Sequence, residues 1–136
     1  MNPDQKILVK NTWKLVAPMA DEAARRFYDR LFEIDAGTRA LFESSDMPGQ
    51  RRKLVQALSL VVHGIDDLAT LAPVIADLGR RHAQLGVSSL QYELVGAALL
   101  WTLEQMLGVA WTAEARTAWT SAYAALADLM KDAAMS

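Results

Sequence analysis

The 136-residue chain holds two histidines and no cysteine, which narrows the metal chemistry open to it. Because the chain has no thiol, we can exclude disulfides, thiolate nucleophiles, iron–sulfur clusters and zinc ribbons. His63 lies opposite the apolar stripe of its predicted helix, so we expect it to face water and give it no role. His82 shares its helical face with Ile75, Leu78 and Leu85. We therefore expect its imidazole to point inward.

A lone inward-facing imidazole supports two interpretations. The simpler one is a core histidine bonded to a backbone carbonyl. The other is an axial metal ligand, because one imidazole cannot hold bare zinc but can hold a metal whose other bonds come from a cofactor. Haem is such a cofactor, and it needs a flat apolar slot and cations for its propionates. Gly79, one turn before His82, is expected to leave space beside the ring.

Other chemistries lack their motifs. The sequence contains no G-x-G-x-x-G, no G-x-x-x-x-G-K-[ST], no H-E-x-x-H and no glutamate three residues before a histidine. With 14 basic and 16 acidic residues, it has no cationic excess for nucleic acid or an anionic membrane. We find no apolar run of about 18 residues and no signal peptide, so we expect a cytoplasmic protein with neither partner.

Helical spacing dominates the elements that must position these residues, and we predict an all-α fold in a single domain over residues 1–136. Asn2, Ser88 with Gln91, and Thr112 are expected to cap helices, and Gly86 to end one. The predicted helices run over residues 2–18, 21–35, 50–66, from about 73 to 86, 88–107 and 112–133, with one short turn over 38–42.

A set of motifs resembles single-domain bacterial globins over nearly the whole chain. In order, these motifs are RRFYDRLF, ALF ending at Phe42, QRRKL, LGRRHAQLGV, QYELVG and AWTSAY. The resemblance is closest to the globin portion of flavohaemoglobins and to their reductase-free relatives. It implies a three-over-three helical sandwich with helices A, B, C, E, F, G and H.

The resemblance also implies how haem b would be held. His82 would be the proximal iron ligand, its other ring nitrogen donating to the backbone carbonyl near Leu78. Phe42 would pack on the porphyrin edge, and Lys53 and Arg81 are candidates for the propionates. The expected cofactor-binding residues are Phe42, Lys53, Leu54, Leu78, Arg81, His82, Val87 and Tyr92.

On the distal side, the matching positions are Tyr28, Gln50 and Leu54. The phenol and the carboxamide would each stabilise a negatively polarised ligand by roughly 1–3 kcal/mol. We therefore expect reversible binding of dioxygen, nitric oxide and carbon monoxide with high oxygen affinity, and leave oxygen transport, storage, scavenging and sensing open. Any enzymatic activity would be at most nitric oxide dioxygenation that depends on a separate reductase.

The sequence departs from the flavohaemoglobin pattern on the proximal side. Tyr92 matches the family's tyrosine ten residues after the histidine, but the position of its partner glutamate falls on Ala134, with Asp132 the nearby acid.

Two alternative functions stay open. One is a histidine phosphotransfer module, disfavoured because His82 lies on an apolar stripe. The other is a helical interaction domain without a cofactor.

Overall fold

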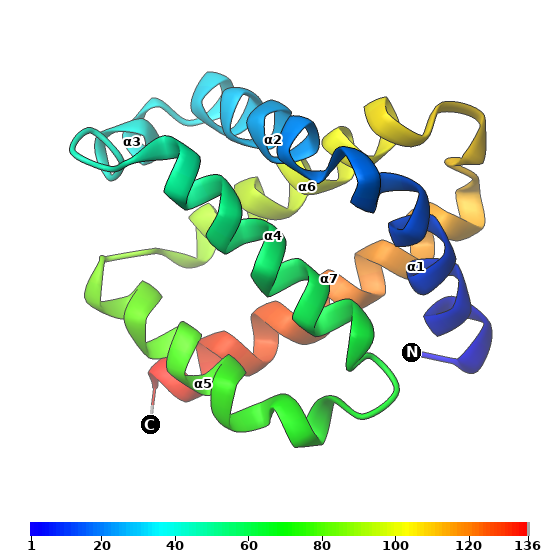
Figure 1. Cartoon of the computed structure of the whole chain (residues 1–136). Coiled ribbons are helices and arrows are strands. Elements are labelled where there is room, and N and C mark those ends of the chain that lie inside the picture. The colour runs from blue at the N-terminus through cyan, green and yellow to red at the C-terminus, as the bar shows by residue number, and fades with distance from the viewer. Residues whose placement is uncertain (136) are drawn as a thin grey trace.

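A computed structural model describes residues 1–135, which form seven α-helices and two short 3-10 helices without a β-strand (Figure 1). The α-helices are α1 (Pro3–Val16), α2 (Ala20–Ile34), α3 (Ala36–Ala40), α4 (Met47–His63), α5 (Leu68–Gln84), α6 (Ser89–Leu107) and α7 (Ala113–Ala134). The 3-10 helices are η1 (Ala17–Met19) and η2 (Gly108–Ala110). The all-α prediction is confirmed.

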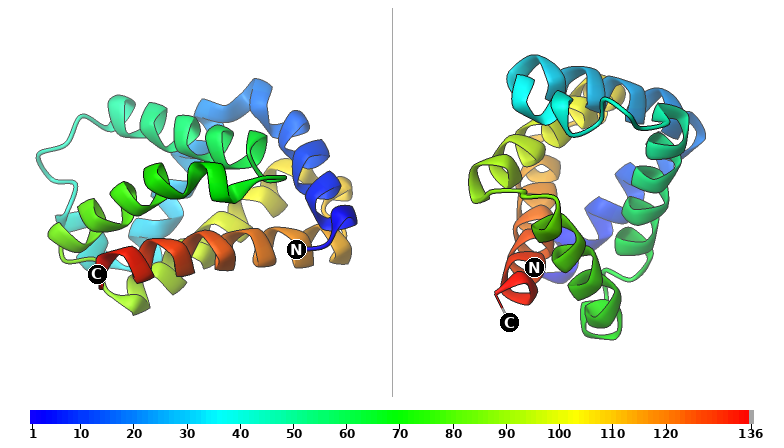
Figure 2. Two further views of the ribbon diagram at one scale, coloured as in Figure 1. Left: turned by 90° about the horizontal axis from the view of Figure 1, so that it is seen from below. Right: turned by 90° about the vertical axis from the view of Figure 1, so that its left-hand side faces the viewer.

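The long helices form the two layers of a three-over-three sandwich. In Figure 1, α4 and α5 lie in front of α6 and α7, and the right-hand view of Figure 2 shows the layers from the side. Helix α5 packs along α7, and α2 packs along α6 and α4. The C-terminal end of α7 therefore lies beside α5, which carries His82.

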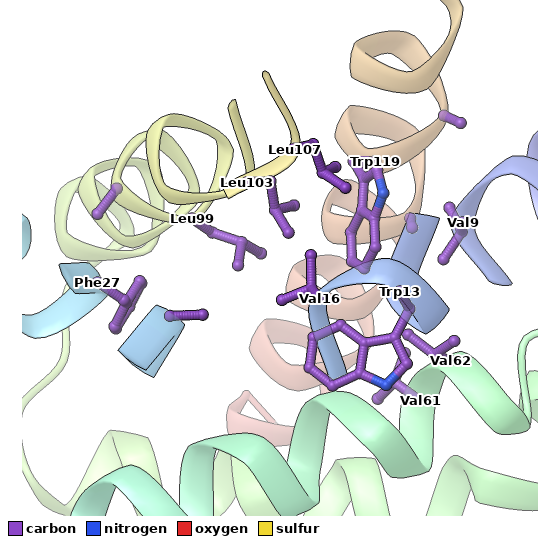
Figure 3. Packing of buried hydrophobic residues seen from close by; sticks show 14 of the residues in the cluster. Val9, Trp13, Val16, Phe27, Val61, Val62, Leu99, Leu103, Leu107 and Trp119 are labelled. Atoms are coloured by element: carbon purple, nitrogen blue, oxygen red, sulfur yellow. The ribbon is translucent and has the colours of Figure 1, made fainter. Parts of the chain in front are cut away.

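The main core lies where α1, α2, α4, α6 and α7 meet (Figure 3). Two tryptophans, Trp13 and Trp119, pack there with ring centroids 6.4 Å apart. The indole N–H of Trp119 donates to Thr12 Oγ1 at 2.8 Å, and that hydroxyl donates to the Leu8 carbonyl at 2.7 Å. This chain of hydrogen bonds satisfies the buried indole N–H of Trp119 and the buried hydroxyl of Thr12.

The predicted caps are present at three helices. Asn2 accepts from the Gln5 amide at 2.8 Å, and Thr112 accepts from the Ala115 amide at 3.0 Å. The Ser88 box is reciprocal, with distances of 2.9 and 3.2 Å between its two backbone amides and the opposing side chains. Gly86 has φ +80°, so it ends α5 in the conformation that glycine adopts most easily.

Three predicted boundaries are wrong. Helix α3 begins at Ala36 rather than Thr38, because the Asp35 carboxylate accepts from the Gly37 amide at 3.1 Å. Helix α4 begins at Met47 rather than residue 50, because a proline fits a first helical turn. Helix α5 begins at Leu68, so Pro73 lies inside it rather than near its start. Proline has no N–H, so α5 loses one helical hydrogen bond at this position. Tertiary packing of the helix compensates for that loss.

One segment of the described chain, Ser89–Ala110, is long and apolar enough to cross a membrane by length and composition. The prediction that the chain has no apolar run of about 18 residues is therefore wrong. The segment contributes Ala98, Leu99 and Leu103 to the main core. Core helices pass the same test, so the composition of α6 is weak evidence for a membrane.

Candidate functional site

A cavity of about 300 Å³ is lined by residues of α2, α3, α4, α5 and α6 and the segments between them. It brings together six residues that the sequence singles out: Tyr28, Phe42, Gln50, Leu54, His82 and Val87. The rest of the lining is mostly apolar and consists of Phe27, Leu31, Thr38, Leu41, Ser45, Leu85, Gln91 and Val95. The cavity is thus a largely apolar space with a few polar groups, as expected of a small-molecule site.

His82 enters this cavity from the last turn of α5 and is half-buried. Its Nδ1 lies 2.7 Å from the Leu78 carbonyl oxygen. Since a carbonyl can only accept, Nδ1 carries the proton and Nε2 keeps its lone pair. Within residues 1–135, no hydrogen bond engages Nε2. The backbone of α5 therefore fixes the tautomer that a metal-binding imidazole requires.

The potential hydrogen-bond donors of the cavity come from other helices. Tyr28 lies on α2, whereas Gln50 and Leu54 lie four residues apart on α4 and so share a face. Neither the Tyr28 hydroxyl nor the Gln50 carboxamide makes a hydrogen bond to any residue of the described chain. Two donors are thus uncommitted at the cavity wall.

Burial keeps the Tyr28 phenol protonated. The ring packs against Phe42 with centroids 5.4 Å apart and against Phe32 at 5.9 Å. Desolvation raises the pKa of Tyr28 to about 12, because the buried phenolate would lose its hydration. At neutral pH the side chain is therefore a hydrogen-bond donor.

Four of the residues that the sequence assigns to the cofactor do not line the cavity. Leu78 is connected to the cavity only through His82, whose ring nitrogen donates to the Leu78 carbonyl. Lys53 is exposed on α4, and Arg81 is exposed and pairs with Asp77 at 3.0 Å. Tyr92 packs beside His82, with ring centroids 6.2 Å apart and planes inclined by 31°. The roles of all four stay predictions.

The expectation for Gly79 is wrong. A Cβ at this position would lie 2.2 Å from the Met130 carbonyl oxygen and 2.7 Å from the Met130 Cα. The missing side chain therefore lets the backbones of α5 and α7 approach one another, and does not open space beside the imidazole. This contact is one turn before His82, so it helps to set where the ring lies.

Sequence reasoning missed two residues on the α7 side of Tyr92. The Tyr123 hydroxyl donates to the Tyr92 carbonyl at 2.5 Å, and burial together with the neighbouring Tyr92 phenol raises the pKa of Tyr123. Lys131 Nζ lies 5.3 Å from the centroid of the Tyr92 ring. The motif AWTSAY contains Tyr123, but no spacing within one helix reveals a contact with another. Ala134, at the glutamate position, is exposed at the end of α7.

The residues present fit a haem. An apolar slot surrounds one imidazole whose Nε2 is free of hydrogen bonds to the described residues. No group of three or more His, Cys, Asp or Glu in that part of the chain could hold a bare metal ion. A porphyrin supplies the nitrogen ligands that the protein does not offer, so the single histidine suffices.

Comparisons with known proteins agree with this fit. The sequence profile of the family described as Globin matches residues 25–130. A flavohemoprotein of Bordetella parapertussis is 33% identical over 132 residues, which cover 96% of this chain and 33% of that protein. A flavohemoprotein of Rhodopirellula baltica is 34% identical over 124 residues, and one of Bacillus subtilis is 29% identical over 123. The chain spans about a third of the length of the curated relatives it matches.

Proposed function

The chain belongs to the globin family, a family of haem-binding proteins, and on that premise we propose that it holds haem b through His82 and binds dioxygen, nitric oxide and carbon monoxide reversibly. The observation that carries the proposal is the 2.7 Å contact between His82 Nδ1 and the Leu78 carbonyl, which leaves Nε2 available at the cavity. Family membership sets aside the histidine phosphotransfer module and the cofactor-free interaction domain.

Each part of the cavity has a task in this proposal. His82 Nε2 binds the metal, and the Leu78 carbonyl holds the imidazole in one tautomer and orientation. Apolar side chains such as Val87 and Phe42 cover the porphyrin and exclude water. Lys53 and Arg81 are proposed for the propionates, which their long side chains would have to reach by rotation.

Bound haem would supply an iron that binds a diatomic ligand. The uncommitted Tyr28 hydroxyl and Gln50 carboxamide would donate to a ligand with partial negative charge, and Leu54 would keep their part of the cavity apolar. Each donor stabilises such a ligand by roughly 1–3 kcal/mol in a buried site. Two donors therefore favour slow oxygen release and high oxygen affinity.

Nitric oxide detoxification is a second proposed activity. Nitric oxide, dioxygen and an electron together give nitrate, so turnover needs a reductant. The relatives are flavohemoproteins about three times as long as the matched segment. We propose that a reductase supplies this electron and that residues 1–136 form one globin domain of a cytoplasmic protein, without nucleic-acid or membrane partners.

The histidine pair offers a matched test. Absorption spectra of the ferric, ferrous and carbon monoxide forms are recorded for the native protein, His82→Ala and His63→Ala. His63 is exposed at the end of α4, so its replacement is expected to leave the spectra unchanged. His82→Ala is expected to lose the normal axial ligation and to regain it when imidazole is added. Absence of a Soret band from the native protein supplied with haem, or an unchanged spectrum of His82→Ala, refutes the proposal.

A further inference from the structure

Lys131, a cation on α7, lies beside the ring of Tyr92, and Tyr92 in turn lies beside His82. Lys131 Nζ is 5.3 Å from the Tyr92 ring centroid, within the range of a cation–π contact. The Tyr92 and His82 rings are 6.2 Å apart and inclined by 31°. Tyr92 is only 8% exposed. Little water therefore separates the ammonium from the imidazole along this path.

The packing between α5, α6 and α7 holds this arrangement in place. Tyr92 lies in a buried cluster with Ile75 of α5 and with Ala127 and Met130 of α7. The Tyr123 hydroxyl also donates to the Tyr92 carbonyl at 2.5 Å. These contacts hold the Tyr92 ring against α7, the helix that carries Lys131, so the cation–π contact joins two helices that are packed together.

We propose that Lys131 is a positioning residue that acts through Tyr92 to place positive charge on the His82 side of the cavity. This inference rests on the proposed haem binding. The two ring distances put the ammonium within roughly 12 Å of the imidazole, where a partly buried charge is screened less than an exposed one. A cation there makes His82 a weaker electron donor and opposes the extra positive charge of the oxidised cofactor.

The other charges near His82 do not carry this effect. Arg81, the next cation along α5, is paired with Asp77 at 3.0 Å, and both side chains are exposed. Asp128 and Asp132 on α7 are also exposed, so water screens them more strongly than the half-buried Lys131. The partner glutamate of the flavohaemoglobin pattern falls on Ala134 here, and the charge that Lys131 brings has the opposite sign to that glutamate.

The reduction potential of the haem-loaded protein tests the inference. Lys131→Met is expected to lower it, and Lys131→Glu to lower it further. Lys131→Arg keeps the charge and is expected to leave it unchanged. Arg116→Met removes an exposed cation from the first turns of the same helix, so it controls for net charge and is expected to have no effect. The iron–histidine vibration of the ferrous form is expected to rise in frequency in Lys131→Met and Lys131→Glu.

The outcomes separate the two proposals. A native protein that does not bind haem through His82 refutes the proposed function and this inference with it. A native protein that does bind haem in this way, with equal potentials in native, Lys131→Met and Lys131→Glu, overturns the inference alone. Thermal unfolding of each variant shows whether the fold is intact. A potential that falls in Lys131→Arg as much as in Lys131→Met also overturns it, because packing rather than charge would then be responsible.

Discussion

Replacing Gly79 with alanine is expected to destabilise the protein, although alanine is the better helix former. The new Cβ would meet the Met130 carbonyl oxygen at 2.2 Å, whereas ordinary contacts start at 3.4 Å, so α5 and α7 must separate by about 1 Å. Overpacking of this kind costs roughly 1–3 kcal/mol, and the helix propensity of alanine returns about 1 kcal/mol. We expect a net loss of up to ~2 kcal/mol and a fall in Tm of up to ~7 °C.

The assay is denaturant and thermal unfolding of the protein without haem, beside Gly49→Ala as a matched control. At Gly49, in the first turn of α4, the nearest atom to a new Cβ is Asp46 Oδ2 at 2.6 Å, which a side-chain rotation removes. Gly49→Ala is therefore expected to be neutral or stabilising. If Gly79→Ala is as stable as the native protein, the close approach of α5 to α7 is not rigid and the reasoning fails. Because His82 lies one turn further along α5, haem retention by Gly79→Ala is expected to weaken as well.

Three further predictions concern hydrogen bonds and ionisation. Tyr28→Phe and Gln50→Leu are each expected to speed oxygen dissociation by about 5–150-fold, the equivalent of 1–3 kcal/mol, in stopped-flow measurements. Equal rates would refute their role as donors. Thr12→Val leaves the Trp119 indole N–H without its partner and is expected to cost ~1–3 kcal/mol in denaturant unfolding, whereas Thr120→Val, at an exposed site, should cost little. The Tyr28 pKa of about 12 exceeds the unfolded value near 10, so the unfolded chain loses its proton first and stability falls as pH rises from about 10 to 12. Tyr28→Phe should remove part of that fall in pH-dependent unfolding, and an identical pH profile would contradict it.

Local sequence signals predicted most helix ends because capping is a local interaction. The Asn2, Ser88 and Thr112 caps involve residues three apart, and the positive φ of Gly86 follows from one residue's conformational freedom. The start of α5 could not be found in this way. Pro73 is a helix breaker by its own chemistry, and only packing of α5 against other helices explains why the helix continues through it.

The site was predictable where motif order and helical periodicity coincide. Six of the residues chosen from the sequence line one cavity. The contact between His82 and Leu78 joins residues four apart on one helix, so the spacing alone predicts it. The contacts of Gly79 with Met130 and of Lys131 with Tyr92 join different helices. A single sequence has no signal for such contacts, so the charge on the Tyr92 side was not anticipated.

Leu41 and Leu85 have a consequence for how the protein is made in a cell. Both line the cavity, yet they are 41% and 64% exposed, so the rim of the cavity presents apolar surface to water. A chain synthesised faster than porphyrin is delivered would carry this rim bare and be prone to stick to its own copies. The soluble yield should therefore track the supply of the prosthetic group, and chaperones would compete for the chains that wait for it.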